Sequence, residues 1–451
     1  MHTCRGLLID RSRSFRLVRR FVLYPLITVV VLAAAAIAYY FATLYTPERP
    51  QEGFLALTGA TVLTGPDLDP LRGATVLVRD GIVIEVGGAD DVDVPAGATT
   101  LDLRGTTLMP GLVDLHVHLA SPARERGEEV GIVQMPRLVL DVARYVPATR
   151  RAFLEHGVTS VRSLGDEHQW VTELRRMSAD GELEGPRVFA AGPLFTTARG
   201  HPVVTFGVDP QSDGVRLAST ADGARRAVRA LASGEGRVDV IKIVQESGSR
   251  DFPMEPIAPD VLRALVGEAH AHGLAVTAHW GTLEDLDDVL AAGVDELQHL
   301  ESRGVLDGWP AATLDSLLEQ DVPIAPTLAV TQVAIPPQVH QQLRHRVAEL
   351  HAAGGRVVAG SDAGMPGVAF GAGLQRELEL LVDSGLTPRE ALRAATSEAA
   401  HVLGADDIGA IEPGRAADLV VVDGDPLDRI EAIRDVVMVL RDGRVVVDRR
   451  D

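Results

Sequence analysis

Between about residue 110 and residue 402, short apolar runs alternate with longer stretches whose apolar residues recur at helical spacing. Apolar, β-branched runs of this length predict buried strands, and the stretches between them predict amphipathic helices. Glycines such as Gly157 and Gly273 precede several runs, as is typical where a helix ends and a short turn enters a strand. The predicted strands cover residues 112–119, 159–164, 188–191, 238–244, 275–280, 296–300, 323–330 and 356–361.

This alternation predicts the fold of the central segment. Eight strand–helix units in about 290 residues fit a (β/α)8 TIM barrel, an α/β fold, over residues 110–402. A doubly wound sheet is the alternative, but no glycine-rich phosphate loop follows the first strand. Thr387 and Glu390 predict a capping box at the start of a late helix, with Pro388 at its first position.

Both flanks of the barrel segment are rich in β-forming runs and have no long helix of their own. The dipeptides Asp80-Gly81 and Asp442-Gly443 each separate two such runs, which indicates hairpin turns. We therefore expect residues 46–109 and 403–451 to form one small composite domain, a β-sandwich built from both ends of the chain.

The first residues differ sharply from the rest. Residues 1–20 form a basic segment, and no charge occurs from residue 21 to residue 45. That length is enough to cross a hydrocarbon core of about 30 Å at about 1.5 Å per residue. We expect a single-pass transmembrane helix in the cell membrane, with a cytoplasmic amino terminus and an extracytoplasmic catalytic domain. The alternative is a cleaved signal peptide, with Ala36-Ile37-Ala38 as its cleavage site.

Composition narrows the function classes. The chain of 451 residues is 46% hydrophobic, which is ample for a folded core. Its 43 lysines and arginines are outweighed by 63 acidic residues, and the net charge of −20 argues against nucleic-acid binding. The only cysteine, Cys4, excludes an internal disulfide, a cysteine-ligated zinc site and a cysteine nucleophile in the main body.

Lys242 is the only lysine in the chain, so every other basic residue among the 43 is arginine. A biased codon pool with one surviving lysine is one interpretation. The other is that position 242 needs an amine, because a guanidinium group cannot replace it. An unpaired ammonium in an apolar strand would be costly.

Polar side chains gather at the carboxyl ends of the predicted strands. His116 and His118 are two residues apart at the end of the first strand and therefore point to the same face. Each strand-end residue taken alone has an ordinary alternative role, such as a hydrogen-bonded structural histidine or a helix-capping aspartate. A barrel places its chemistry on this face, and imidazoles with a carboxylate suit zinc-like ions. The other strand-end candidates are Lys242, His279, His299 and Asp362.

These motifs make the chain resemble the amidohydrolase superfamily over roughly residues 55–450. The strand around Lys242 looks most like the branch with imidazolonepropionase-like proteins and metal-dependent Xaa-Pro or Xaa-Arg dipeptidases. The matching pieces are the run 110–118, Lys242, His279, His299, the run Gly360-Ser361-Asp362-Ala363-Gly364 and the run 409–419.

The resemblance implies a site with two divalent metal ions, with zinc as the expected metal. His116, His118 and Asp362 would hold one ion, and His279 and His299 the other. Lys242, carboxylated by carbon dioxide, would bridge them together with a hydroxide. That hydroxide would attack an amide carbonyl, and Asp362 would act as general base and then as general acid toward the leaving nitrogen.

We expect a membrane-anchored hydrolase of carbon–nitrogen bonds, with a dipeptide or an N-acyl amino acid as substrate. His201 is a candidate for substrate binding or oxyanion stabilisation, with a plain loop histidine as the alternative. Trp280 is a candidate pocket wall, with core packing equally open. The competing functions are a mononuclear cyclic-amide hydrolase or deaminase and a non-catalytic barrel scaffold. The sequence leaves oligomerisation open.

Overall fold

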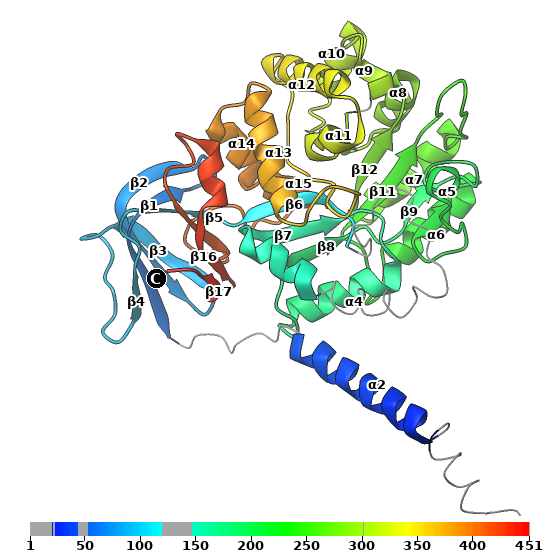
Figure 1. Ribbon diagram of the computed structural model, residues 1–451. Coiled ribbons are helices and arrows are strands. Elements are labelled where there is room, and N and C mark those ends of the chain that lie inside the picture. Colours follow the sequence, from blue (N-terminus) through cyan, green and yellow to red (C-terminus); the bar gives the residue numbers. More distant parts are fainter. Residues whose placement is uncertain (1–19, 21–22, 44–52, 120–146, 301, 451) are drawn as a thin grey trace, which may run out of the picture. The chain divides into compact units, whose positions relative to one another are not determined.

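The computed structural model describes residues 20, 23–43, 53–119, 147–300 and 302–450 (Figure 1). The chain divides into two compact units, one of residues 1–45 with 129–148 and one of residues 46–128 with 149–451. The main described element of the first unit is the uncharged helix α2, Tyr24–Thr43.

The predicted transmembrane helix over residues 21–45 is not supported. Among the described residues, no helix is long and apolar enough to cross a membrane.

In the second unit, strands from both ends of the chain form one eight-stranded sheet, ordered β17-β16-β15-β5-β1-β2-β3, with β4 paired to β1. Leu419 of β15 pairs antiparallel with Pro110 of β5 and so joins the two ends. The strands are continuous in one sheet, whereas a sandwich predicts two. Register shifts on either side of Ala60 divide β1 into a part that pairs with β4 and a part that pairs with β5. The strand bounds are β1 Phe54–Thr64, β2 Asp69–Arg79, β3 Ile82–Gly88, β4 Thr99–Asp102, β5 Thr106–Pro110, β15 Leu419–Asp423, β16 Val436–Arg441 and β17 Arg444–Asp448.

Two turns of this sheet follow the sequence pattern. Asp80 and Gly81 have φ angles of 51° and 81°, and Asp442 and Gly443 have φ angles of 49° and 72°. Consecutive positive φ values are what a two-residue hairpin turn requires, and the Asp-Gly pair tolerates them. Buried residues from both chain ends, including Val62, form one hydrophobic core cluster.

The barrel strands are parallel and lie in two hydrogen-bonded groups that close on each other. Asp239 N donates to Ala190 O at 2.9 Å and joins the groups on one side. On the other side, Val358 N donates to Ile324 O at 3.0 Å and Leu115 N donates to Ala359 O at 3.1 Å. The first group holds β6 Leu112–Val117, β7 Val158–Ser163 and β8 Arg187–Ala190; the second holds β9 Leu194–Thr196, β10 Val215–Leu217, β11 Val240–Gln245, β12 Ala275–Trp280, β13 Glu296–Gln298 and β14 Ile324–Ala325.

Three predicted strands differ from the observed ones. The third continues past Gly192, which has a φ of 62°, as the separate strand β9. The seventh ends at Ala325 because Pro326 has no N–H to donate and Thr327 takes a φ of 50°. The eighth, residues 356–361, is not a regular strand, although its backbone bonds to both neighbours and closes the barrel.

Helices surround the barrel strands in Figure 1. The predicted capping box is present: Thr387 Oγ1 accepts from Glu390 N, and the Glu390 carboxylate accepts from Thr387 N at 2.7 Å. The bounds are α4 His168–Ala179, α5 Val203–Phe206, α6 Ala221–Leu231, α7 Pro259–Ala271, α8 Leu283–Ala292, α9 Ser302–Val305, α10 Ala311–Glu319, α11 Leu328–Ala334, α12 Pro337–Ala352, α13 Ala372–Asp383, α14 Pro388–Ala394, α15 Ser397–Leu403 and the 3-10 helix η3 Ile430–Arg434.

Candidate active site

Three of the predicted ligands meet where β6 and the eighth segment end. Asp362 Oδ1 lies 3.2 Å from His118 Nε2 and 3.5 Å from His116 Nε2. One ligand atom from each of the three residues lies within 4.8 Å of the others. Two imidazoles and a carboxylate at such separations form a set that one divalent cation can bind.

The other predicted histidines continue the cluster. The ring of His299 lies 4.7 Å from the ring of His116 and 4.9 Å from the ring of His279, between centroids. His299 Nδ1 is 3.8 Å from Asp362 Oδ2. His201 stacks on His279 with centroids 5.1 Å apart and ring planes inclined by 5°. The structure thus brings His201 into the cluster, beyond the first three ligands.

Lys242 comes from the interior of β11 and is 3% exposed. Its Nζ has no hydrogen-bond partner among the described residues. Burial lowers the pKa of Lys242 to about 7, although the charges of Asp362 and Glu296 act in the opposite direction. An amine with this pKa is largely deprotonated just above neutral pH, which gives it nucleophilic character.

Burial also decides the charge state of the imidazoles. It is the main reason why the pKa values of His116 and His299 fall well below the usual value. It lowers the pKa values of His279 and His201 to about 3. For His118 burial acts in the same direction, but the nearby carboxylate of Asp362, whose Oδ1 lies 3.2 Å from Nε2, outweighs it and raises the pKa. Neutral imidazoles are the form that binds metals.

Buried polar residues orient the ligands. His116 Nδ1 donates to Gln298 Oε1 at 2.7 Å, and this leaves Nε2 as the nitrogen with the lone pair on the Asp362 side. Asp114 accepts from the backbone N–H groups of His116 and Ser361, and so ties β6 to the eighth segment. Sequence reasoning missed Gln298 and Asp114. The available signal was their position, directly before His299 and two residues before His116.

The backbone at the site takes uncommon conformations. His299 and Asp362 have φ angles of 66° and 59°, in the left-handed region that non-glycine residues rarely adopt. Such conformations cluster at functional sites, where the surrounding structure holds them. Gly360 permits the close approach of the eighth segment to β6, because a Cβ there would lie 2.8 Å from His116 Cβ.

The donor set therefore fits divalent metal ions of the zinc type. It combines neutral imidazole nitrogens with the carboxylate of Asp362. Asp362 Oδ1 and Lys242 Nζ are both buried and have no hydrogen-bond partner among the described residues, and such atoms are costly unless a ligand satisfies them.

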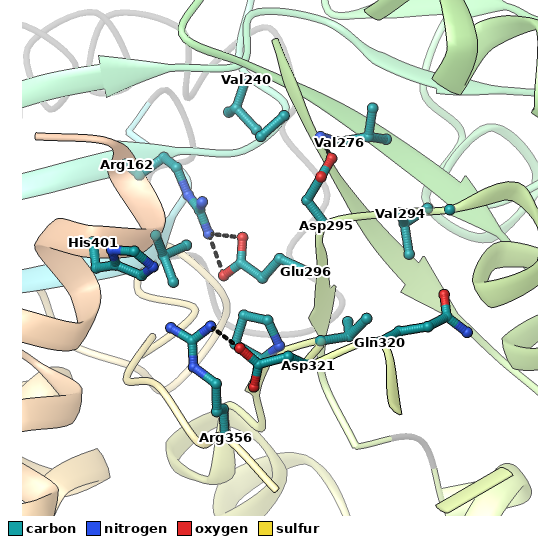
Figure 2. Close-up of a pocket in the computed structure, with 15 residues that line it drawn as sticks. Arg162, Val240, Val276, Val294, Asp295, Glu296, Gln320, Asp321, Arg356 and His401 are labelled. Carbon is teal, nitrogen blue, oxygen red and sulfur yellow. Dashed lines mark hydrogen bonds and ion pairs between the residues drawn. The ribbon is translucent and has the colours of Figure 1, made fainter. Parts of the chain in front are cut away.

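A cavity of about 460 Å³ lies elsewhere in the barrel. Figure 2 shows the residues that line it. Its lining includes Val240, Ala275 and Glu296, which begin β11, β12 and β13, so it opens at the amino ends of the strands. Arg162 and Glu296 form a buried ion pair there, with Nη2 and Oε2 2.7 Å apart. No candidate ligand lines this cavity, and its two arginines, Arg162 and Arg356, are paired with Glu296 and Asp321. It is not the site of the strand-end cluster.

Trp280 lies apart from the ligand side chains. It follows His279 directly in β12 and so points to the opposite face of the strand. The side chain is fully buried, and a Cβ on Gly304 would lie 2.3 Å from its ring. This burial agrees with the packing alternative for Trp280, and its candidacy as a pocket wall stays a prediction.

The sequence profile of the Amidohydrolase family matches residues 107–446. The chain belongs to the amidohydrolase family. The amidohydrolase is 26% identical over 420 residues to an ochratoxinase of Aspergillus niger. The aligned region covers 85% of this chain and 84% of the ochratoxinase. It is 28% identical over 403 residues to an imidazolonepropionase of Sphingopyxis alaskensis, and the aligned region covers 82% of this chain and 92% of that protein.

Solved structures show the same fold. A Xaa-Pro dipeptidase with bound methionine matches this amidohydrolase with a TM-score of 0.73 and 22% identity, over 87% of this chain and 99% of that chain. The family match and the relatives establish a hydrolase that acts on carbon–nitrogen bonds on a TIM-barrel-type α/β domain. Members of the family generally use divalent metals, which agrees with the cluster of His116, His118 and Asp362.

Proposed function

We propose that this amidohydrolase cleaves the amide bond of a dipeptide or an N-acyl amino acid with two divalent metal ions, which we assign as zinc. The observation that carries the proposal is the meeting of His116, His118 and Asp362 beside further buried imidazoles. These three residues would hold one ion, and His279 and His299 the other. Bound ions would polarise the substrate carbonyl and lower the pKa of water.

Asp362 moves the proton in this proposal. Its buried Oδ1, which has no hydrogen-bond partner among the described residues, accepts a proton from the attacking water. When the C–N bond breaks, the same oxygen passes that proton to the leaving nitrogen. The products are a carboxylic acid and an amine. His201, whose Nδ1 lies 2.7 Å from Thr205 Oγ1 and whose ring stacks on His279, would stabilise the developing oxyanion.

Lys242 would connect the two ligand sets as a carbamate. Its amine is buried, lacks a hydrogen-bond partner among the described residues and has a pKa of about 7. The neutral amine adds to carbon dioxide and releases a proton, which converts a buried base into an anionic oxygen ligand. Arginine cannot form this group.

The relatives support the proposed substrate class, and a direct screen tests it. The similarity to a Xaa-Pro dipeptidase with bound methionine favours a dipeptide or a related N-acyl amino acid. The zinc-loaded protein should hydrolyse at least one member of a panel of dipeptides and N-acyl amino acids. His116→Ala should lose this activity. Turnover that survives both His116→Ala and removal of metal by a chelator would contradict the proposal.

A mononuclear cyclic-amide hydrolase or deaminase is the second candidate. Among the described residues, His116, His118 and Asp362 are the only set of three ligand residues with atoms within 4.8 Å, and an imidazolonepropionase is 28% identical. The number of ions in the fully active protein separates the two candidates.

We also propose, from the sequence, that the enzyme is anchored in the cell membrane with its catalytic domain outside the cytoplasm. The support is the basic composition of residues 1–20 beside the uncharged residues 21–45.

A further inference from the structure

We infer that Glu246 is a positioning residue for His279, and that it holds the ring so that Nδ1 is the nitrogen available to a divalent cation. The inference rests on the proposed function, because it concerns the second ligand set. Glu246 Oε2 lies 3.0 Å from His279 Nε2, and the two side chains are 5% and 9% exposed. A carboxylate can only accept, so the shared hydrogen belongs to Nε2 and the lone pair stays on Nδ1.

The position of Glu246 is fixed by its two neighbours in the chain. Gln245 accepts from Ile257 N at 3.0 Å and donates to Ile257 O at 3.2 Å. Ser247 donates to Asp285 twice, from its N–H at 3.0 Å and from its hydroxyl at 2.5 Å. These bonds hold the backbone on both sides of Glu246. Since Glu246 is four residues after Lys242, it continues the strand face that carries the lysine.

The loop after β12 leaves room for this carboxylate. A Cβ on Gly281 would lie 2.7 Å from Glu246 Cγ and 2.9 Å from Glu246 Oε1. The same loop enters α8 through a capping box, in which Asp285 accepts from Thr282 N at 2.9 Å. Asp285 therefore joins the loop after β12 to the loop after β11, and the two loops hold His279 and Glu246 together.

His279 is also held from other directions. The ring of His201 stacks on it at 5.1 Å, and the ring of His299 meets it edge-on at 4.9 Å with an angle of 71°. Neither of these rings determines which nitrogen of His279 carries the hydrogen. The Glu246 contact does, and a carboxylate that receives the second N–H of a ligand histidine typically contributes a factor of about 10 to 100 in metal affinity.

The experiment compares Glu246→Ala and Glu246→Gln with wild type. Metal affinity is measured by chelator competition, and the His279 tautomer by NMR of the metal-loaded, ¹⁵N-histidine-labelled protein. Glu246→Ala should weaken the second ion about 10- to 100-fold and leave the first ion bound. Glu246→Gln keeps an acceptor oxygen and should stay within about threefold of wild type. The control is Glu379→Gln, a buried carboxylate paired with Arg434 and Arg376, which should leave both ions unchanged.

The outcomes separate this inference from the proposed function. Two ions and amide hydrolysis in wild type, with unchanged affinity in Glu246→Ala, would overturn the role of Glu246 alone. Equal losses in Glu246→Ala and Glu246→Gln would also overturn it, since the charge or direct ligation would then matter more than the accepted hydrogen bond. A wild-type protein that binds no divalent ion would refute the proposed function, and the inference with it.

Discussion

At the scale of single residues, the site depends on which ring nitrogen each histidine keeps free. Gln298 Oε1 accepts a hydrogen bond from His116 Nδ1. The amide nitrogen of Gln298 donates to Thr277 Oγ1 at 2.8 Å, and this fixes the orientation of the amide. Thr327 Oγ1 lies 2.8 Å from His299 Nδ1. These contacts hold neutral rings in place before any ion binds. The conformational entropy of the rings is therefore lost during folding and not during metal binding.

The second ligand set gives a prediction at this scale. His279→Ala should bind one ion per chain instead of two, because the second ion loses an imidazole, and turnover should fall by orders of magnitude. Elemental analysis of the purified protein gives the count. The control is His345→Ala, an exposed histidine of α12, which should keep both ions and full activity. Wild-type protein that is fully active with one ion would show that the binuclear assignment is wrong.

At the scale of elements, helix α13 fixes the start of helix α11. Glu377 of α13 is fully buried and accepts the backbone N–H groups of Leu328 and Ala329 at 3.0 and 2.6 Å. These are the first two residues of α11, whose N–H groups have no partner within the helix. Thr327, which precedes them, contacts His299, so α13 supports the site through the start of α11.

Glu377 predicts a pH dependence of stability. Burial raises its pKa to about 8, against a usual value of 4.5. The folded protein therefore keeps this proton up to about pH 8, whereas the unfolded chain releases it near pH 4.5, so stability falls as the pH rises between them. The loss is at most about 1.4 kcal/mol per pH unit.

Urea unfolding at pH 5, 6, 7 and 8, with chelator present, measures this dependence. Glu377→Gln cannot ionise and loses one acceptor at every pH. The free energy of unfolding of wild type minus that of Glu377→Gln should therefore decline from pH 5 to pH 8. A difference that stays constant or increases would contradict the raised pKa.

The sequence predicted those parts of the barrel whose signal is local. The apolar run of β12 ends at His279 and Trp280 as expected, because nothing interrupts its periodicity. The prediction of a strand over residues 323–330 was wrong beyond Ala325, because Pro326 and Thr327 redirect the backbone and their effect exceeds that of the apolar pattern. The Glu246 contact with His279 joins two different strands, so no local pattern contains it.

At the scale of the whole catalytic unit, the composite sheet leads directly into the site. Leu419 pairs with Pro110, Gly111 N donates to Asp418 O at 2.8 Å, and β6 begins at the next residue. The strand that carries His116 and His118 is therefore braced by the carboxyl-terminal part of the chain. We expect the ligand set to depend on both ends of this unit.

Localisation is also a property of the whole molecule. With a tag after Asp451, protease added to intact cells should remove the tag if the catalytic domain is extracytoplasmic. The basic residues 1–20 beside the uncharged residues 21–45 motivate this result. A tag that is cut only after lysis, while a known extracytoplasmic control protein is cut in intact cells, would show that the orientation is the reverse of the predicted one.

The central claim is that Lys242 joins two metal sets into one hydrolytic site, and the turnover of Lys242→Arg with saturating zinc tests it most directly. Arginine is a basic side chain of similar length, but it cannot form a carbamate with carbon dioxide. Provided that circular dichroism shows a folded variant, the account predicts loss of the second ion and of amide hydrolysis. Wild-type turnover in Lys242→Arg would contradict it, because Lys242 would then be an ordinary strand residue and the mononuclear site would be the better explanation.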